Sequence, residues 1–297
     1  VFTPLYNRIN TLKRTYESLK RQTSKDFVWL IIDDGSTDNP YEIIKEWIKI
    51  NNGFEIKYVY KENGGMHTAH NTAYENIDTE LNVCVDSDDY MPDNAVQLII
   101  DCWNKNKNKG YAGIIALDFA DLTKKVIGKE LPTDKESTTL MGYYNNGGFG
   151  DKKLIYRTDI IKQTPPYPVF NNEKYVALAY KYHLIDEKYE LKILNECVCI
   201  VDYQMDGSST NMYRQYVRNP KGFAFWRKEQ MKHSINTKQK IKACIHYVSS
   251  SLIAKNKHFI KESPEKFLTV LSVPLGFLLK IIVVKKSKSS YMKVEGI

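Results

Sequence analysis

Three carboxylates follow a short apolar run in the stretch Val83-Cys84-Val85-Asp86-Ser87-Asp88-Asp89. Apolar residues that lead directly into acids indicate a buried strand whose carboxyl end presents hard oxygen ligands. Open α/β sheets bind their ligands at the carboxyl ends of strands. The stretch therefore predicts a site for a divalent metal and a diphosphate. Acids also gather in solvated turns, so an Asp-x-Asp sequence is weak evidence by itself.

A second apolar run ends in the same way. Phe27-Val28-Trp29-Leu30-Ile31-Ile32 is followed by Asp33-Asp34-Gly35-Ser36-Thr37-Asp38. The run is continuous rather than alternating, as expected for a parallel strand buried on both faces. Asp-Gly suits a turn, and Ser36, Thr37 or Asp38 suits the cap of a following helix. Two adjacent acids are more than a turn requires, so Asp33 and Asp34 are also candidate site residues.

The elements that must position these acids alternate between strand and helix. After Thr3-Pro4, Asn7 or Asn10 is expected to cap a helix with apolar residues at Ile9, Leu12, Tyr16 and Leu19. Residues 41–48 predict a second helix, residues 56–60 a third strand, and residues 68–74 the start of a third helix. This order predicts an α/β fold with a parallel, doubly wound sheet and right-handed crossovers.

Together these segments resemble the family 2 glycosyltransferases. The resemblance rests on Thr3-Pro4-Leu5-Tyr6-Asn7, on Ile32 to Asp38, on Asn63-Gly64-Gly65 with Ala69-His70-Asn71, and on Asp86-Ser87-Asp88-Asp89. It covers about the first 100 residues and extends more loosely to about residue 220. It implies a GT-A fold with a mostly parallel sheet, a nucleotide-sugar donor, a divalent cation and inversion at the anomeric carbon.

The resemblance also implies roles for individual residues. Asp88 would chiefly hold Mn²⁺ or Mg²⁺, and Asp86 would contact the ribose or the metal shell. Asp33 or Asp34 would read the base or the ribose, since a carboxylate is a pure acceptor. The remaining donor-binding residues that it implies are Thr3, Pro4 and Tyr6 at the base, and Asn63, Gly64, Asn71 and Ser87 near the nucleotide.

The candidate general base lies after a glycine-rich loop at residues 145–151. Residues 170–182 show helical apolar spacing, which places Glu173 in the first turn of a predicted helix. The helix dipole favours an acid there even without chemistry. The resembling family often has its catalytic acid at such a helix start, although this chain has Asn172-Glu173 in place of the commoner Glu-Asp pair. Glu173 is the predicted base, and Asp151 is the alternative.

Basic residues beyond residue 203 are candidates for the diphosphate. Residues 203–211 follow a predicted strand and precede a helix, and Asn219-Pro220-Lys221-Gly222 starts another. In the resembling enzymes this region folds over the diphosphate as a lid. Arg214, Arg218 and Lys221 are then candidate phosphate contacts, because cations compensate the charge of the leaving group. For each of them, a solvated surface cation remains the alternative.

The charge balance is basic, with 43 Lys and Arg residues against 35 Asp and Glu residues. The basic residues do not alternate with aromatic residues as in a nucleic-acid-binding module, so no nucleic-acid partner is expected. Many lysines lie between residues 255 and 293, around an apolar segment at 267–284 that Pro274, Gly276 and Lys280 interrupt. The segment suits an interfacial anchor on an anionic membrane. The alternative is a helix packed on the catalytic domain.

The sequence also yields predictions about compartment and domains. Five cysteines without zinc-ligand spacing indicate a reducing compartment, and Cys197 and Cys199 are expected to be core residues of one strand. Val1 falls inside the first predicted strand, so the natural amino terminus is expected to be missing. We expect a catalytic domain at 1–220, with a nucleotide half at 1–117 and an acceptor half at 118–220, and a helical region at 221–297. The predicted location is cytoplasmic, at the inner face of the cell membrane.

The predicted function is transfer of a sugar, with inversion, from a UDP-sugar to a hydroxyl of a glycan or polyprenyl-linked acceptor in cell-surface polysaccharide synthesis. A sugar nucleotidyltransferase is the first alternative. It should show a phosphate loop rich in glycine and arginine after the first strand, where this chain reads Thr3-Pro4-Leu5-Tyr6-Asn7-Arg8. A non-catalytic, membrane-associated nucleotide- or sugar-binding module is the second.

Overall fold

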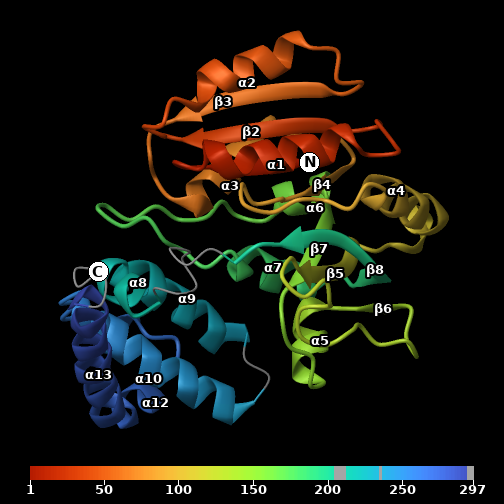
Figure 1. The fold of residues 1–297 in the computed structure, drawn as a ribbon. Coiled ribbons are helices and arrows are strands. Elements are labelled where there is room, and N and C mark those ends of the chain that lie inside the picture. Colours follow the sequence, from red (N-terminus) through yellow and green to blue (C-terminus); the bar gives the residue numbers. More distant parts are fainter. Residues whose placement is uncertain (204–211, 234–235, 293–297) are drawn as a thin grey trace. The chain divides into compact units, whose positions relative to one another are not determined.

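The computed structural model describes residues 1–203, 212–233 and 236–292, and the chain forms two packing units (Figure 1). The first unit contains Val1–Pro166 and Lys181–Gln204, and the second contains Tyr167–Tyr180 and Met205–Ile297. The boundary between Tyr180 and Lys181 falls within helix α7 (Ala179–Asp186). The functional division predicted at residue 220 stays a prediction.

The first part of the first unit is a parallel sheet whose strands alternate with helices. Strand β2 lies between β1 and β3, and both of its neighbours run parallel to it. The predicted helices at 9–19, 41–48 and 68–74 and the predicted strand at 56–60 are all present. These elements are β1 (Phe2–Leu5), α1 (Ile9–Lys20), β2 (Val28–Asp34), α2 (Pro40–Lys49), β3 (Glu55–Lys61) and α3 (Met66–Asn76).

The rest of the first unit forms a mixed sheet in the order β4-β7-β5-β8-β6. Strand β7 is antiparallel to both of its neighbours, whereas β5 and β8 are parallel. A parallel bridge from Phe2 to Cys84 connects β1 to the end of β4 and so joins the two sheets. The elements are β4 (Leu81–Val83), α4 (Ala95–Asn106), a 3-10 turn (Lys107–Lys109), β5 (Gly113–Ala120), β6 (Ser137–Thr138), α5 (Leu140–Asn145), β7 (Lys152–Arg157), α6 (Thr158–Gln163) and β8 (Leu191–Val201).

Helices pack on both faces of the parallel sheet, as a doubly wound fold requires. On one face, α1, α2 and α4 bury their apolar side chains against Trp29 and Ile31 of β2. Tyr16 of α1 stacks on Trp47 of α2 with 4.1 Å between ring centroids. On the other face, His70 of α3 meets Phe2 edge to face at 5.0 Å. Burial of these side chains supplies most of the free energy that holds the helices to the sheet.

The second unit contains helices in its described part, besides the irregular residues 167–178. The elements are α8 (Met212–Arg218), α9 (Pro220–His233), α10 (Thr237–Ile253), α11 (Phe259–Glu262), α12 (Lys266–Leu271) and α13 (Val273–Met292). The main packing partners are α9 with α10, α10 with α13, and α8 with α13. None of the helices in the described residues has the length and apolarity that a membrane span requires.

The expected helix over residues 170–182 is wrong at its start, because only α7 from Ala179 onward is helical. The apolar spacing is satisfied instead by packing on α9. Tyr175 stacks on Phe223 at 4.5 Å between centroids, and Tyr180 meets Phe225 edge to face at 4.9 Å. Aromatic contacts between segments have replaced local helical periodicity.

Candidate functional site

The carboxyl ends of β1, β2 and β4 lie at one edge of the sheet. Leu5 of β1 pairs with Asp33 of β2, and Phe2 pairs with Cys84 just after β4. All of these pairings are parallel, so the acids that follow β2 and β4 emerge at the same edge. This is the edge at which ligands bind in open α/β sheets.

The acids after β4 form a tight turn that helix α1 holds in place. The N–H of Asp89 donates to the carbonyl of Asp86 at 2.9 Å and closes the turn. From α1, the Arg14 guanidinium donates to the carbonyl of Asp88 at 2.7 Å, and the Thr15 hydroxyl donates to the carbonyl of Asp89 at 2.6 Å. Because the contacts use the backbone, the carboxylates of Asp86 and Asp88 keep their oxygens for a ligand.

Arg14 is a positioning residue that the sequence does not reveal. Its guanidinium also pairs with Asp121 at 3.1 Å and Asp202 at 2.7 Å, and it lies 4.7 Å from the centre of the Tyr90 ring. In the sequence it is one of several basic residues in an amphipathic helix. Its partners are more than 70 positions away, so no local pattern distinguishes it from a solvated cation.

The electrostatics of the turn fit a divalent cation. Burial and the charge of Asp86 raise the pKa of Asp88, and burial raises the pKa of Asp89 to about 8 although Lys153 opposes this. Half-buried carboxylates that repel each other present hard oxygen ligands, which Mg²⁺ and Mn²⁺ prefer. Among the described residues, no group of three His, Cys, Asp or Glu side chains forms a metal cluster. A cation held by Asp88 and Asp86 would therefore complete its shell with phosphate and water oxygens.

Asp33 and Asp34 are both buried and both bonded within the fold. Asp33 accepts hydrogen bonds from the Ser36 N–H at 2.8 Å and from the Tyr58 hydroxyl. Asp34 accepts from the Lys61 ammonium and from two backbone N–H groups, those of Gly64 at 2.9 Å and Gly65 at 2.8 Å. Their contacts therefore hold the loops after β2 and β3, and their role toward a base or ribose stays a prediction.

The expected helix caps at Asn7 or Asn10 are wrong. The Asn7 side chain instead accepts from the Thr37 N–H at 2.7 Å, and Asp38 accepts from the Ile9 N–H at 3.1 Å. The loop after β1 and the loop after β2 are thus bonded to each other. Asp38 caps α1 rather than the helix that follows it in sequence, because the parallel sheet brings the two loops together.

The three residues predicted to line the base pocket differ in exposure. Thr3 is fully buried, and its hydroxyl accepts from the Trp29 indole N–H at 3.0 Å. Pro4 is also buried, whereas the Tyr6 side chain is 48% exposed. Of the three, Tyr6 is therefore the side chain available to stack on a base.

Unpaired polar atoms lie beside the loop after β3. Asn63 Oδ1 and both ring nitrogens of His67 are buried without a hydrogen-bond partner in the described part of the chain. Burial lowers the pKa of His67 to about 4, so its imidazole is neutral and offers one donor and one acceptor. His67 lies between the predicted donor residues Gly64 and Asn71 in sequence, and Asn71 itself is half-buried on α3. The sequence analysis missed His67, although its place within the motif was a usable signal.

The alternative base, Asp151, lies in the same unit as the acidic turn. It is exposed just before β7, and the Tyr203 hydroxyl donates to it at 2.6 Å. The buried Asp118 and Lys153 lie nearby, 3.7 Å apart, and burial raises the pKa of Asp118 to about 6. Asp151 thus retains oxygens that are open to an incoming hydroxyl.

Glu173 belongs to the second unit, where it caps helix α9. Its carboxylate accepts from the backbone N–H of Lys221 at 3.0 Å and of Gly222 at 2.8 Å, and only 8% of the residue is exposed. A Cβ on Gly222 would lie 2.0 Å from the carbonyl oxygen of Tyr175, so only glycine allows this approach. The dipole contact that the sequence suggests is present, but with α9 rather than with a helix of its own.

The predicted phosphate contacts also lie in the second unit. Arg214 and Arg218 belong to α8, and Lys221 is exposed in the first turn of α9. Most of the predicted lid, residues 204–211, lies outside the described residues. Their approach to a diphosphate stays a prediction.

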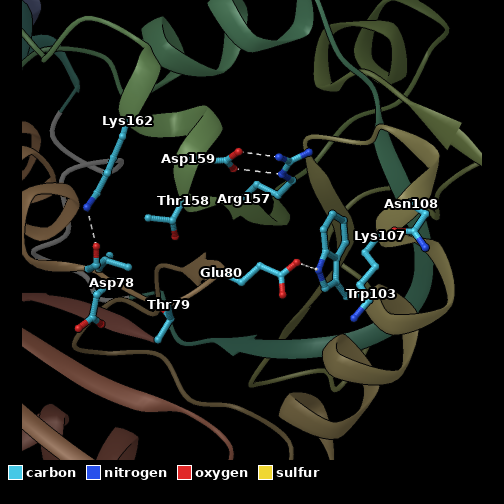
Figure 2. A pocket seen from close by; sticks show the side chains of 11 residues that line it. Asp78, Thr79, Glu80, Trp103, Lys107, Asn108, Arg157, Thr158, Asp159 and Lys162 are labelled. Atoms are coloured by element: carbon cyan, nitrogen blue, oxygen red, sulfur yellow. Dashed lines mark hydrogen bonds and ion pairs between the residues drawn. The ribbon is translucent and has the colours of Figure 1, made fainter.

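A cavity of about 490 Å³ lies at the opposite end of β4 from the acidic turn (Figure 2). Its charged side chains are already paired: Arg157 with Asp159 at 2.5 Å, Glu80 with the Trp103 indole at 2.7 Å, and Lys162 with the carbonyl of Ile77 at 2.6 Å. These pairs leave the cavity without convergent groups for catalysis.

Comparisons with known proteins agree with this architecture. Streptococcus pneumoniae glycosyltransferase GlyA is 34% identical over 99 residues, which are 33% of this chain and 14% of GlyA. Pasteurella multocida chondroitin synthase is 34% identical over 107 residues, which are 36% of this chain and 11% of the synthase. The chain thus spans less than a quarter of the length of these curated relatives.

Solved structures share the fold over nearly the whole chain. S. aureus TarS residues 1–349 in complex with UDP-GlcNAc give a TM-score of 0.63 at 16% identity, covering 98% of this chain and 90% of that one. Pyrobaculum calidifontis mannosyltransferase PcManGT with GDP-Man and Mn²⁺ gives 0.54 at 14% identity, covering 94% and 86%. The model of glycosyl transferase family 2 matches residues 1–164, more than half of the sequence. The chain therefore belongs to glycosyl transferase family 2.

Proposed function

We propose that the chain transfers a sugar from a UDP-sugar to a hydroxyl of a glycan or polyprenyl-linked acceptor, with inversion at the anomeric carbon. The observation that supports this most directly is the turn at Asp86–Asp89. Its backbone is bonded to α1, while two half-buried carboxylates remain at the ligand-binding edge of the sheet. Mn²⁺ or Mg²⁺ held by Asp88 and Asp86 would stabilise the charge of the departing diphosphate.

The chain's own residues would bind the donor and accept the proton. Tyr6 would stack on the base, and His67 and Asn63 would provide the buried polar atoms that face the nucleotide. In the transfer step the acceptor oxygen forms a bond to the anomeric carbon as the bond to the diphosphate oxygen breaks, and a base takes the hydroxyl proton. Asp151 suits the base role better than Glu173, because its carboxylate is exposed while both Glu173 oxygens accept backbone N–H groups.

UDP titration with and without Mn²⁺ tests the donor site. Asp88→Asn should lose the metal-dependent part of the affinity and stay folded, because this carboxylate has no packing role. Asp93→Asn is the matched control, since Asp93 is exposed and pairs only with Arg21 at the surface. Equal metal dependence in Asp88→Asn and the wild type would refute the assignment.

Product analysis separates the alternatives. A transferase releases UDP from a UDP-sugar when acceptor is present. A sugar nucleotidyltransferase releases pyrophosphate from UTP and a sugar phosphate, and a non-catalytic module binds UDP without turnover. A panel of UDP-sugars with a lipid-linked acceptor extract should therefore yield free UDP.

A further inference from the structure

Helices α12 and α13 pack with their polarity reversed relative to a water-soluble bundle. Their large apolar side chains point outward and are at least 40% exposed. These residues are Phe267, Val270, Leu271, Leu275, Phe277, Leu278, Ile281 and Ile282. A soluble helix buries its apolar stripe and exposes its polar face. We call these eight residues the apolar face.

Small and polar residues occupy the inner side of the same helices. Thr269, Ser272 and Ser287 are at most 5% exposed, and Thr269 Oγ1 lies 2.6 Å from the Ser263 hydroxyl. A Cβ on Gly276 would lie 2.5 Å from the Val248 side chain of α10, so glycine permits this close contact. On α10, the consecutive residues Ser249–Ser251 are buried. Small residues at a close helix contact are typical of helices packed in lipid.

From this reversed polarity and its charged border, we propose that the apolar face lies in the interfacial layer of an anionic membrane, with α13 parallel to the bilayer plane. The face extends the proposed function by placing the enzyme beside a polyprenyl-linked acceptor. No helix in the described residues meets the requirement for a span, so the contact is interfacial, at a depth of ~5–10 Å.

Lysines around the apolar face favour a lipid surface over a second copy of the chain. Lys285 and Lys288 are exposed one turn beyond Ile282, and Lys280 lies beside Phe277 with its ammonium 5.8 Å from the ring centre. The nearest acid, Glu265, already pairs with Lys240 at 2.6 Å. Two such faces would bring like charges together, whereas an anionic leaflet attracts each lysine.

Vesicle flotation tests the proposal with three outward leucine and isoleucine side chains. The wild type should float with phosphatidylglycerol-containing vesicles and much less with pure phosphatidylcholine. Leu275→Ser/Leu278→Ser/Ile282→Ser should lose at least tenfold in partitioning. The control variant Ile48→Ser/Ile50→Ser/Leu122→Ser removes three exposed apolar side chains from the other unit and should float like the wild type.

Two further measurements keep the outcomes distinct. Urea unfolding should give the same midpoint for the leucine and isoleucine variant as for the wild type, because the side chains are exposed. UDP release with a soluble acceptor, measured without vesicles, should also be unchanged, so loss of flotation with retained turnover separates this proposal from the proposed function. Equal flotation of the variant and the wild type, or a dimer in sedimentation velocity that the variant dissociates, would overturn the membrane assignment.

Discussion

Substitution of Glu173 tests the contact between residues 171–175 and helix α9. In Glu173→Ala the N–H groups of Lys221 and Gly222 lose both acceptors. Hydrogen bonds to a charged group contribute about 1.5–3 kcal/mol each, and loss of a helix cap costs about 0.5–2 kcal/mol. Since water replaces part of the lost contact at a helix end, we expect a decrease of about 2–4 kcal/mol in the free energy of unfolding.

Glu173→Gln should lower the free energy of unfolding by about half as much as Glu173→Ala. The amide retains one acceptor oxygen, but its NH₂ group faces a backbone donor. Urea denaturation gives the change, and hydrogen exchange at Lys221 and Gly222 reports on the two bonds directly. Glu196→Gln, an exposed acid on β8, is the matched control. A wild-type urea midpoint together with unchanged exchange at both amides would refute the capping assignment.

The same variants separate a structural role from a catalytic one. A general base contributes about 10²–10⁴-fold to the rate. If Glu173 is only a cap, Glu173→Gln should transfer within a few-fold of the wild type where it remains folded, and Asp151→Asn should lose ~10²-fold with normal donor affinity. A collapse of turnover in Glu173→Gln with normal UDP binding would instead restore Glu173 as the base.

Three further predictions test the structure elsewhere. Arg14→Ala should weaken metal-dependent UDP affinity at least tenfold in calorimetry, because it frees the carbonyl of Asp88, and Arg14→Lys should restore only part of it since lysine lacks the planar fork. Gly276→Val should lower the free energy of unfolding by about 1–3 kcal/mol in urea titrations, through overpacking against Val248. Burial lowers the pKa of His70 to about 3, so the unfolded chain binds more protons below about pH 6.5 and stability should fall with acidification by about 1.4 kcal/mol per pH unit. Urea titrations from pH 6.5 to 4.5 should show a shallower slope for His70→Gln.

The parallel part of the fold is predictable from sequence because its signals are local. The continuous apolar run before Asp33 and the helical spacing from Ile9 to Leu19 each specify an element without reference to distant residues. Contacts between distant segments are not predictable in this way. The bonds from Arg14 to Asp88 and from Glu173 to Gly222 join residues 74 and 49 positions apart. The irregular segment after Phe170 has helical spacing for the same reason, since its aromatic residues pack on α9.

The division between the two packing units coincides with the limit of the family resemblance. The family model ends at residue 164, and the second unit begins at Tyr167. The candidate donor and metal residues, from Thr3 to Asp88, fall inside the matched region, whereas Glu173, Arg214, Arg218 and Lys221 fall outside it. Donor and metal chemistry place the same demands on related enzymes, while acceptors differ among them, so a shared donor half beside a diverged remainder is the expected pattern. We therefore expect acceptor choice to depend on the second unit, where exchange of residues should change the acceptor while UDP affinity is retained.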